Sequence, residues 1–229
     1  LEACLANRIP ENTLLSHDLF EGIHARVALV SDIVMLEEYP TRYLGYTRRM
    51  HRWIRGDWQL LPWLFPKIPS DNAGNTLPNT FSTLDRWKIF DNLRRSLVTP
   101  VLLMLLIVAW LGFIGEPLFW TLMTFAIVGF PLIMSLLTNL RYQIATKSVL
   151  SIIQSSRPDA LRWVFALIFL PYEALLALNA IGTTLVRLFI TRTRMLQWTT
   201  AAQTAKHFKV SRSSESTWRE MSIVPIFAL

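Results

Sequence analysis

Three long apolar runs constrain this chain more than any other feature. They cover residues 97–113, 118–137 and 163–190. A helix needs roughly 20 mostly apolar residues to cross a bilayer, and backbone amides inside the bilayer must bond within their own segment. The first two runs therefore predict a pair of transmembrane helices over residues 97–138.

The third run allows two conformations. It is apolar from residue 163 to 178 except for Glu173, and it ends at a group of basic residues that begins with Arg187. A single span would leave this basic group on the outer side of the membrane, whereas a short or re-entrant helical hairpin returns it to the cytoplasmic side. For residues 161–192 we favour the hairpin, and a span with an interfacial helix is the alternative.

Basic residues predict the orientation in the membrane. The turn between the first two runs contains a single charged residue, Glu116. The outer flanks of the two runs are basic and contain Arg94, Arg95, Arg141 and Lys147. Because cytoplasmic loops of membrane proteins are enriched in Lys and Arg, we expect residues 1–66 and a loop over 139–160 to be cytoplasmic. We expect the same of the polar segment 193–229.

Composition excludes several classes of protein. Of the 229 residues, 52% are hydrophobic and 17% are charged, which is too apolar for an ordinary soluble domain. The net charge of +7 fits the basic cytoplasmic side of a membrane protein, and no nucleic-acid motif accompanies it. One cysteine and four histidines without ligand spacing argue against a disulfide or a metal site. The chain begins at Leu1 rather than Met, so we expect it to be part of a longer protein.

The segment 67–96 predicts a loop followed by a helix in the membrane interface. Proline, glycine and asparagine punctuate residues 67–80. From Leu84 onward, apolar residues gather on one side of a helical pattern that has basic flanks, as in helices that lie in the interface. We interpret three tryptophans as interfacial anchors, namely Trp58, Trp63 and Trp87.

The first 66 residues have the pattern of a mixed α/β segment. Ser16 and Gly22 predict the start and the end of a short helix. Residues 27–30 and 34–36 are strand candidates, because each is a short apolar run. A longer helix is predicted from residue 41 to 64, with prolines at its end.

Residues 48–59, with the sequence RRMHRWIRGDWQ, combine four arginines, one histidine and two tryptophans. Such a stretch is poor core material, because each buried cation needs a partner. It suits a sugar nucleotide, because arginine forks bind diphosphate oxygens and an indole stacks on the apolar face of a sugar. For Arg48, Arg55 and Asp57 a purely structural role in side-chain pairs along the helix remains an alternative.

These residues resemble a known family. RMHRW at 49–53 is similar to the Q/R-x-x-R-W signature of processive membrane glycosyltransferases, such as cellulose and hyaluronan synthases. LSHD at 15–18 lies where those enzymes have a T-E-D-type motif. The longer sequence segments around these motifs are more similar to those of the cyclic β-1,2-glucan synthases. It comprises PENTLLSHDLFEG at 10–22, HRWIRGDWQ at 51–59, RWKIFDNLRRSL at 86–97, LPYEA at 170–174 and QWTTAAQ at 197–203.

The resemblance implies an α-rich membrane protein fragment. It would contain the C-terminal part of a GT-A-like α/β glycosyltransferase domain, followed by interfacial and transmembrane helices. The activity implied is that of an inverting glucosyltransferase, which uses UDP-glucose in the bacterial inner membrane. Asp18 would be the general base, Arg49 and Arg52 would bind the diphosphate, and Trp53 would form the acceptor platform. His17 and Arg55 would complete the substrate contacts.

Two departures from the wider family fit the cyclic glucan group: His17 stands where others have Glu, and Arg49 where many have Gln. No Asp-x-Asp occurs in the chain. The Mg²⁺ or Mn²⁺ expected in the full enzyme would therefore have its ligands upstream, and this chain alone would be inactive. A phosphorylase-like domain is expected downstream.

The implied partners are UDP-glucose, the growing glucan, the lipid bilayer and the rest of the same polypeptide, without nucleic acid. A processive synthase of another polysaccharide is one alternative. A non-catalytic transporter or scaffold segment that binds anionic lipid is the other.

Overall fold

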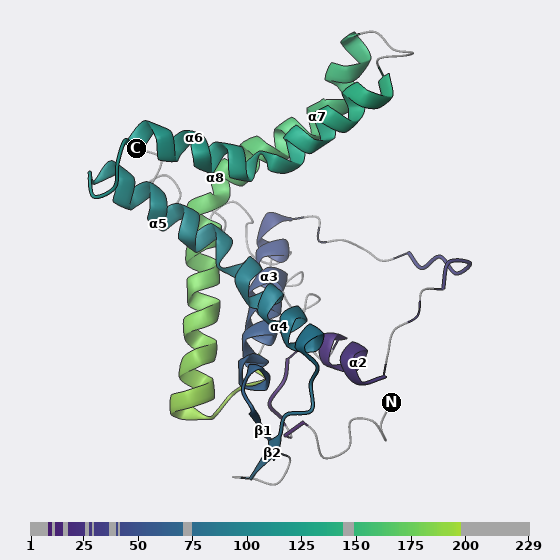
Figure 1. Ribbon diagram of the computed structural model, residues 1–229, viewed down its shortest axis with the longest axis vertical. Helices are drawn as coiled ribbons and strands as arrows, with labels where there is room; N and C mark the ends of the chain where they lie inside the picture. Colours follow the sequence, from purple (N-terminus) through teal and green to yellow (C-terminus); the bar gives the residue numbers. More distant parts are fainter. Residues whose placement is uncertain are drawn as a thin grey trace, which may run out of the picture. The chain divides into compact units, whose positions relative to one another are not determined.

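The computed structural model (Figure 1) shows a mostly helical chain. It describes residues 9–10, 12–15, 18–25, 28, 30–36, 40, 42–70, 75–143 and 149–197, without the side chains of 139–143 and 149–153. The chain divides into two compact units. The first contains residues 1–98 and 176–219, and the second contains residues 99–175 and 220–229.

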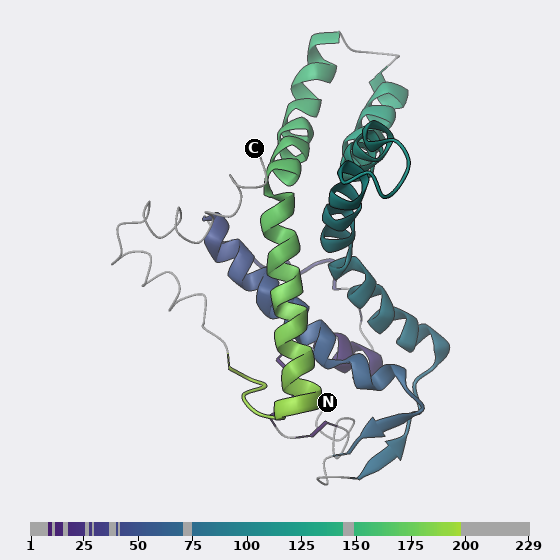
Figure 2. The same ribbon diagram turned by 90° about the vertical axis from the view of Figure 1, so that its left-hand side faces the viewer.

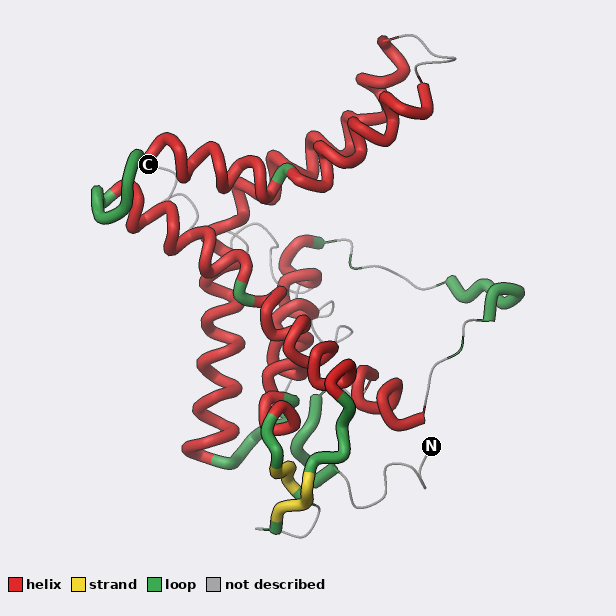
Figure 3. The backbone as a smooth tube through the Cα atoms, viewed as in Figure 1, coloured by secondary structure: helices red, strands yellow, loops and turns green. Residues whose placement is uncertain are grey.

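The first unit contains three complete α-helices and a small hairpin among its described residues. In chain order its elements are α2 (Asp18–Ala25), α3 (Tyr43–Gln59), the 3₁₀ turn η1 (Leu61–Leu64), β1 (Lys67–Pro69), β2 (Thr76–Pro78) and α4 (Thr83–Ser96). The end of α8 (Val149–Leu185) and the π-helical turn η2 (Val186–Thr191) complete it. The two strands pair antiparallel with Ile68 opposite Leu77, and Figure 3 shows them in yellow.

An aromatic core joins α2 to η1 and α4. Phe20 and Trp63 are fully buried, and their rings meet edge to face at 5.4 Å. Around them lie Leu14, Leu60, Ile68, Phe81 and Ile89. An edge-to-face ring pair adds about 1 kcal/mol to the burial of its area. The prediction of Trp63 as an interfacial anchor was therefore wrong, since its indole is a core side chain of this unit.

A second cluster joins α3 to the end of α8. Ile54 packs against Ala177, Ala180 and Ile181. The two alanines lie on one side of α8 and have small side chains, so the backbones of the helices can approach closely. Figure 2 shows α3 beside the yellow-green end of α8.

Helix α4 has a strong local start signal. Ser82 accepts a hydrogen bond from the backbone N–H of Asp85, whose carboxylate accepts one in return from the N–H of Ser82. This reciprocal cap contributes about 1 kcal/mol. One side of α4 is buried through Ile89, whereas Trp87 is exposed. The helix is thus confirmed, and its position in a membrane interface stays a prediction.

The second unit contains α5 (Val98–Trp110) from its second residue, α6 (Pro117–Val128), α7 (Phe130–Gln143) and the first part of α8. Helices α6 and α7 meet at Gly129 with a bend of 56°. There Trp163 of α8 donates its indole N–H to the carbonyl of Phe125 at 3.1 Å. A Cβ at Gly129 would lie 3.0 Å from that indole nitrogen, so glycine allows the close approach.

One helical segment among the described residues, Gln154–Thr191, is by itself long and apolar enough to cross a membrane. There are up to three such segments if α4 with α5 and α6 with α7 each count as one span. The favoured hairpin over 161–192 was wrong, because the helix is continuous there. The two predicted spans over 97–138 correspond to α5 and to the bent pair α6 and α7, and each of these helices is shorter than a full span by itself. Most of the predicted loop 139–160 is helical.

The N-terminal expectations were only partly right. Helix α2 continues past Gly22 to Ala25, and α3 with η1 matches the predicted helix 41–64 closely. The expected strand 34–36 is not formed, and its residues are exposed, with Leu36 at 97%. The loop predicted over 67–80 contains the β1–β2 hairpin. The α-rich class is confirmed, whereas the GT-A-like α/β part stays a prediction.

Candidate functional site

The candidate site is organised around α3, which carries the arginine-rich motif. Three of its polar side chains, His51, Arg55 and Gln59, follow one another at every fourth position and so share one side of the helix. We call them the tethering row. Each of them bonds to a segment far away in the sequence.

Within the tethering row, Gln59 bonds to two distant segments, whereas His51 and Arg55 each bond to one. Its side chain is 1% exposed. The amide oxygen accepts a hydrogen bond from the backbone N–H of Leu15 at 2.7 Å, and the amide nitrogen donates to the carbonyl of Met195 at 3.1 Å. Buried amides require such partners. Gln59 therefore links α3 both to the segment just before Asp18 and to the segment that follows η2.

Arg55 holds the same C-terminal segment. Its guanidinium is buried and donates to the carbonyl of Gln197 at 2.8 Å and to that of Met195 at 3.1 Å. Burial lowers the pKa of Arg55 from its ordinary value, and the nearby Arg187 lowers it further. Both terminal nitrogens thus bond to backbone carbonyls. This is a structural role, but it differs from the side-chain pair along the helix that the sequence suggested as an alternative.

His51 ties α3 to α8. Its Nε2 lies 3.0 Å from the side-chain oxygen of Asn179. Burial lowers the pKa of His51, the bond to Asn179 opposes this, and Arg55 and Arg187 add to the lowering. The ring is therefore neutral at pH 7, and Nε2–H donates to the amide oxygen.

The signature residues Arg49, Arg52 and Trp53 form a second group on α3, which we call the arginine–tryptophan group. The guanidinium carbon of Arg49 lies 4.5 Å from the centroid of the Trp53 ring, within cation–π range. All three side chains are partly buried. The structure therefore pairs Arg49 with Trp53 and leaves this group partly accessible to a ligand.

Asp18 is the first residue of α2 and is exposed to solvent. Its helix is anchored by Phe20 in the aromatic core, and the segment before it is anchored by Gln59. An exposed carboxylate on an anchored helix suits a base that must reach a soluble acceptor. His17 lies outside the described residues.

Asp57 is a partly buried acid on the motif helix. Burial raises its pKa to about 6, while the hydrogen bond from Asn92 at 3.1 Å and the charge of Arg95 act in the opposite direction. Asn92 belongs to α4, so Asp57 connects α3 to the neighbouring helix.

No three His, Cys, Asp or Glu side chains within the described ranges lie close enough together to hold a metal ion. The residues present there do not form a site for Mg²⁺ or Mn²⁺. That the ligands lie upstream of this chain stays a prediction.

The sequence alone did not single out Gln59, nor its partners Leu15 and Met195. A signal was available, because His51, Arg55 and Gln59 repeat with a period of four inside the motif. Such a row predicts that the three side chains lie on one side of the helix and contact the same surroundings. The identity of its partners depends on contacts that span up to 142 residues of chain.

Comparison with known proteins now bears on the site. No protein-family model matches the chain. The chain is 37% identical over 225 residues, or 95% of its length, to the cyclic beta-(1,2)-glucan synthase NdvB of Rhizobium meliloti (strain 1021). The matched segment makes up 8% of that synthase. This chain is therefore a homologue of a segment of a cyclic β-(1,2)-glucan synthase.

Proposed function

We propose that this chain is part of an inverting glucosyltransferase that builds cyclic β-1,2-glucan from UDP-glucose. The relative's name supports a glucan synthase role. In this proposal the chain contributes the acceptor side of the active site together with membrane helices. The protein would be a multi-pass protein of the bacterial inner membrane, with residues 1–66 in the cytoplasm, where the nucleotide sugar is available.

One observation carries the assignment to this site. The side-chain oxygen of Gln59 accepts a hydrogen bond from the backbone N–H of Leu15, with 2.7 Å between nitrogen and oxygen, across 44 residues of sequence. This bond connects the segment that leads to Asp18 with the helix that carries Arg52. A general base and a cationic diphosphate site must be held in register for in-line displacement. The bond supports such a register.

The proposed step uses this chain's own side chains. The carboxylate of Asp18 accepts the proton of the acceptor hydroxyl, and that oxygen attacks the anomeric carbon of glucose from the face opposite UDP. The bond between the anomeric carbon and the diphosphate oxygen breaks, and its electron pair stays on UDP. Arg49 and Arg52 stabilise the growing charge on the diphosphate through charge-assisted hydrogen bonds.

Trp53 supplies an aromatic face for the acceptor sugar, and Arg49 over the ring fixes its orientation. We propose that His17 shapes the same pocket. A diphosphate contact from Arg55 would require loss of its bonds to Met195 and Gln197, so we assign Arg55 to positioning. The Mg²⁺ or Mn²⁺ of the full enzyme would neutralise the diphosphate, and the described residues provide no site for it.

The test is Asp18→Asn in the full-length protein, assayed by incorporation of labelled glucose from UDP-glucose into glucan. Loss of a general base lowers the rate by about 10²- to 10⁴-fold. Glu21→Gln is the matched control, because Glu21 lies in the same first turn of α2 and has the same charge. We expect the control to retain activity.

Normal glucan formation by Asp18→Asn, with membrane insertion equal to that of the wild type, would refute the catalytic role. Linkage analysis of the wild-type product tests the second part of the proposal. A polymer without β-1,2 bonds would place the protein among synthases of another polysaccharide and leave the role of Asp18 intact.

A further inference from the structure

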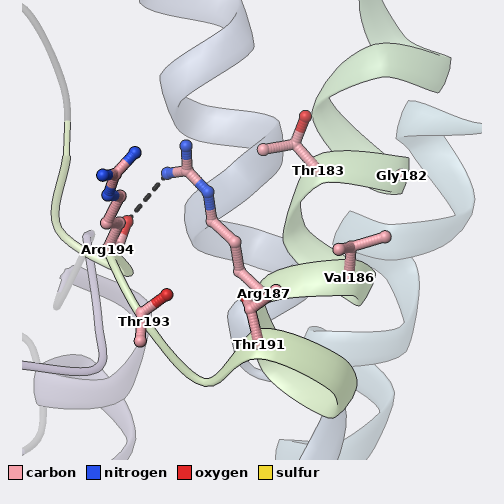
Figure 4. A pocket seen from close by; sticks show the side chains of 7 residues that line it. All are labelled: Gly182, Thr183, Val186, Arg187, Thr191, Thr193 and Arg194. Atoms are coloured by element: carbon pink, nitrogen blue, oxygen red, sulfur yellow. Dashed lines mark hydrogen bonds between the residues drawn. The ribbon is translucent and has the colours of Figure 1, made fainter.

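A cavity of about 670 Å³ lies at the end of α8, in the first unit. Figure 4 shows the residues that line it: Gly182, Thr183, Val186, Arg187, Thr191, Thr193 and Arg194. The lining combines two guanidinium groups with three threonine hydroxyls and contains no carboxylate. Its volume is in the range of small-molecule sites in proteins. The proposed glucosyl transfer uses none of these residues.

Arg187 is held in place by hydrogen bonds, and no described carboxylate neutralises either arginine of the cavity. Arg187 donates to the backbone carbonyl of Arg194 at 2.7 Å and to the side-chain oxygen of Gln197 at 3.3 Å. Figure 4 shows the bond to Arg194 as a dashed line that runs from the guanidinium of Arg187 to the backbone of Arg194. Among the described residues, no carboxylate forms an ion pair with Arg187 or Arg194.

Further positive charge surrounds Arg187. The guanidinium of Arg55 is close enough that Arg187 lowers its pKa, and His51 experiences the same effect. Like charges that approach in a partly buried site repel one another, and a bound anion offsets the repulsion. The binding free energy of an anion should therefore be more favourable in this cavity than at an isolated surface arginine.

The backbone around the cavity has two unusual features. Arg192 and Arg194 adopt left-handed conformations, with φ of 53° and 56°. The preceding turn, Val186–Thr191, is π-helical. A positive φ costs free energy in residues other than glycine, and both features are frequent at functional sites. They shape the segment that presents Thr193 and Arg194 to the cavity.

We propose that this cavity binds a phosphate group. Arg187 and Arg194 would hold its oxygens through charge-assisted bonds, and the threonine hydroxyls would donate to the remaining oxygens. Two sources supply this chemistry: the headgroup of an anionic phospholipid and a free diphosphate. The site does not depend on the proposed glucosyl transfer.

The experiment measures hydrogen–deuterium exchange of residues 186–197 in the full-length protein in nanodiscs. One arm adds inorganic pyrophosphate to protein in phosphatidylcholine alone. The other arm compares phosphatidylcholine with a mixture that contains phosphatidylglycerol. We expect one probe to slow the exchange of this segment. Protection by pyrophosphate identifies a soluble diphosphate, and protection by phosphatidylglycerol identifies a lipid headgroup.

The test variant is Arg194→Gln, because only the backbone of Arg194 takes part in the described hydrogen bonds. Its side chain can change without loss of the contact from Arg187. Loss of one charge-assisted bond should raise the probe concentration for half protection by about tenfold or more. Arg157→Gln, an exposed arginine on the same helix, removes the same charge and should leave it unchanged.

Two results would overturn the proposal. One is the absence of any protection of residues 186–197 by either probe. The other is protection that persists equally in Arg194→Gln and in Arg157→Gln. Because the readout is local to this segment, pyrophosphate bound at the proposed active site does not mimic the expected result.

Discussion

The tethering row and the arginine–tryptophan group of α3 carry similar residues and have different surroundings. On the tethering row, Arg55 is 5% exposed and donates to two backbone carbonyls about 140 residues further along the chain. In the arginine–tryptophan group, Arg52 is only partly buried, and Arg49 lies over an aromatic ring of its own helix. The tethering row thus holds distant segments of the chain together, and we propose that the arginine–tryptophan group faces the substrate.

The largest effect is expected from the same substitution in each group. Arg55→Met should lower the free energy of unfolding by about 2–3 kcal/mol, because the carbonyl of Gln197 loses its donor and that of Met195 keeps only the bond from Gln59. Arg52→Met should cost about 1 kcal/mol or less, as is usual for a partly exposed cation. Thermal unfolding of both variants in one detergent measures the difference. Equal losses of stability would contradict the distinction between the two groups.

A smaller effect is expected on catalysis. Arg52→Lys keeps the charge but loses the planar fork, so kcat/KM for UDP-glucose should fall by about 10- to 100-fold, with little change in the unfolding temperature. Gln59→Glu is a useful contrast, because it perturbs a tether rather than a proposed ligand contact. If Arg52→Lys synthesised glucan at the wild-type rate, the arginine–tryptophan group would not be the diphosphate site.

The smallest effect concerns Asp57, on the side of α3 that faces α4. Its pKa is raised to about 6 in the fold, so the native state retains a proton that the unfolded chain releases near pH 4. Between these values the native state binds more protons, and the free energy of unfolding falls as pH rises.

Asp57→Asn removes this pH dependence, while the amide oxygen of the variant side chain still accepts the bond from Asn92. Above pH 6 we expect the variant to exceed the wild type in stability by on the order of 1 kcal/mol, after allowance for partial exposure. Denaturation of the wild type and of the variant at about pH 4.5 and about pH 7.5, on either side of the raised pKa of Asp57, measures this difference in stability. A wild type that is more stable at the higher pH would contradict the assignment.

Local patterns in the sequence were sufficient for helices α3 and α4, but not for the extent of α8. The capping box at Ser82 and the amphipathic repeat of residues 43–59 depend on neighbours three or four positions away, so these helices can be read from the chain itself. The apolar runs likewise predicted helices, and the homology to a glucan synthase confirmed the resemblance that the motifs suggested.

Only the tertiary structure decided which side of each helix meets which partner. Arg52 and Arg55 are the same residue type in the same motif, and their difference arises from Met195 and Gln197, whose approach no local pattern encodes. Trp63 reads equally well as an interfacial anchor or as a core side chain until Phe20 is seen against it. A helix repeat determines which residues share a side, whereas burial and hydrogen-bond satisfaction depend on segments that are distant along the chain.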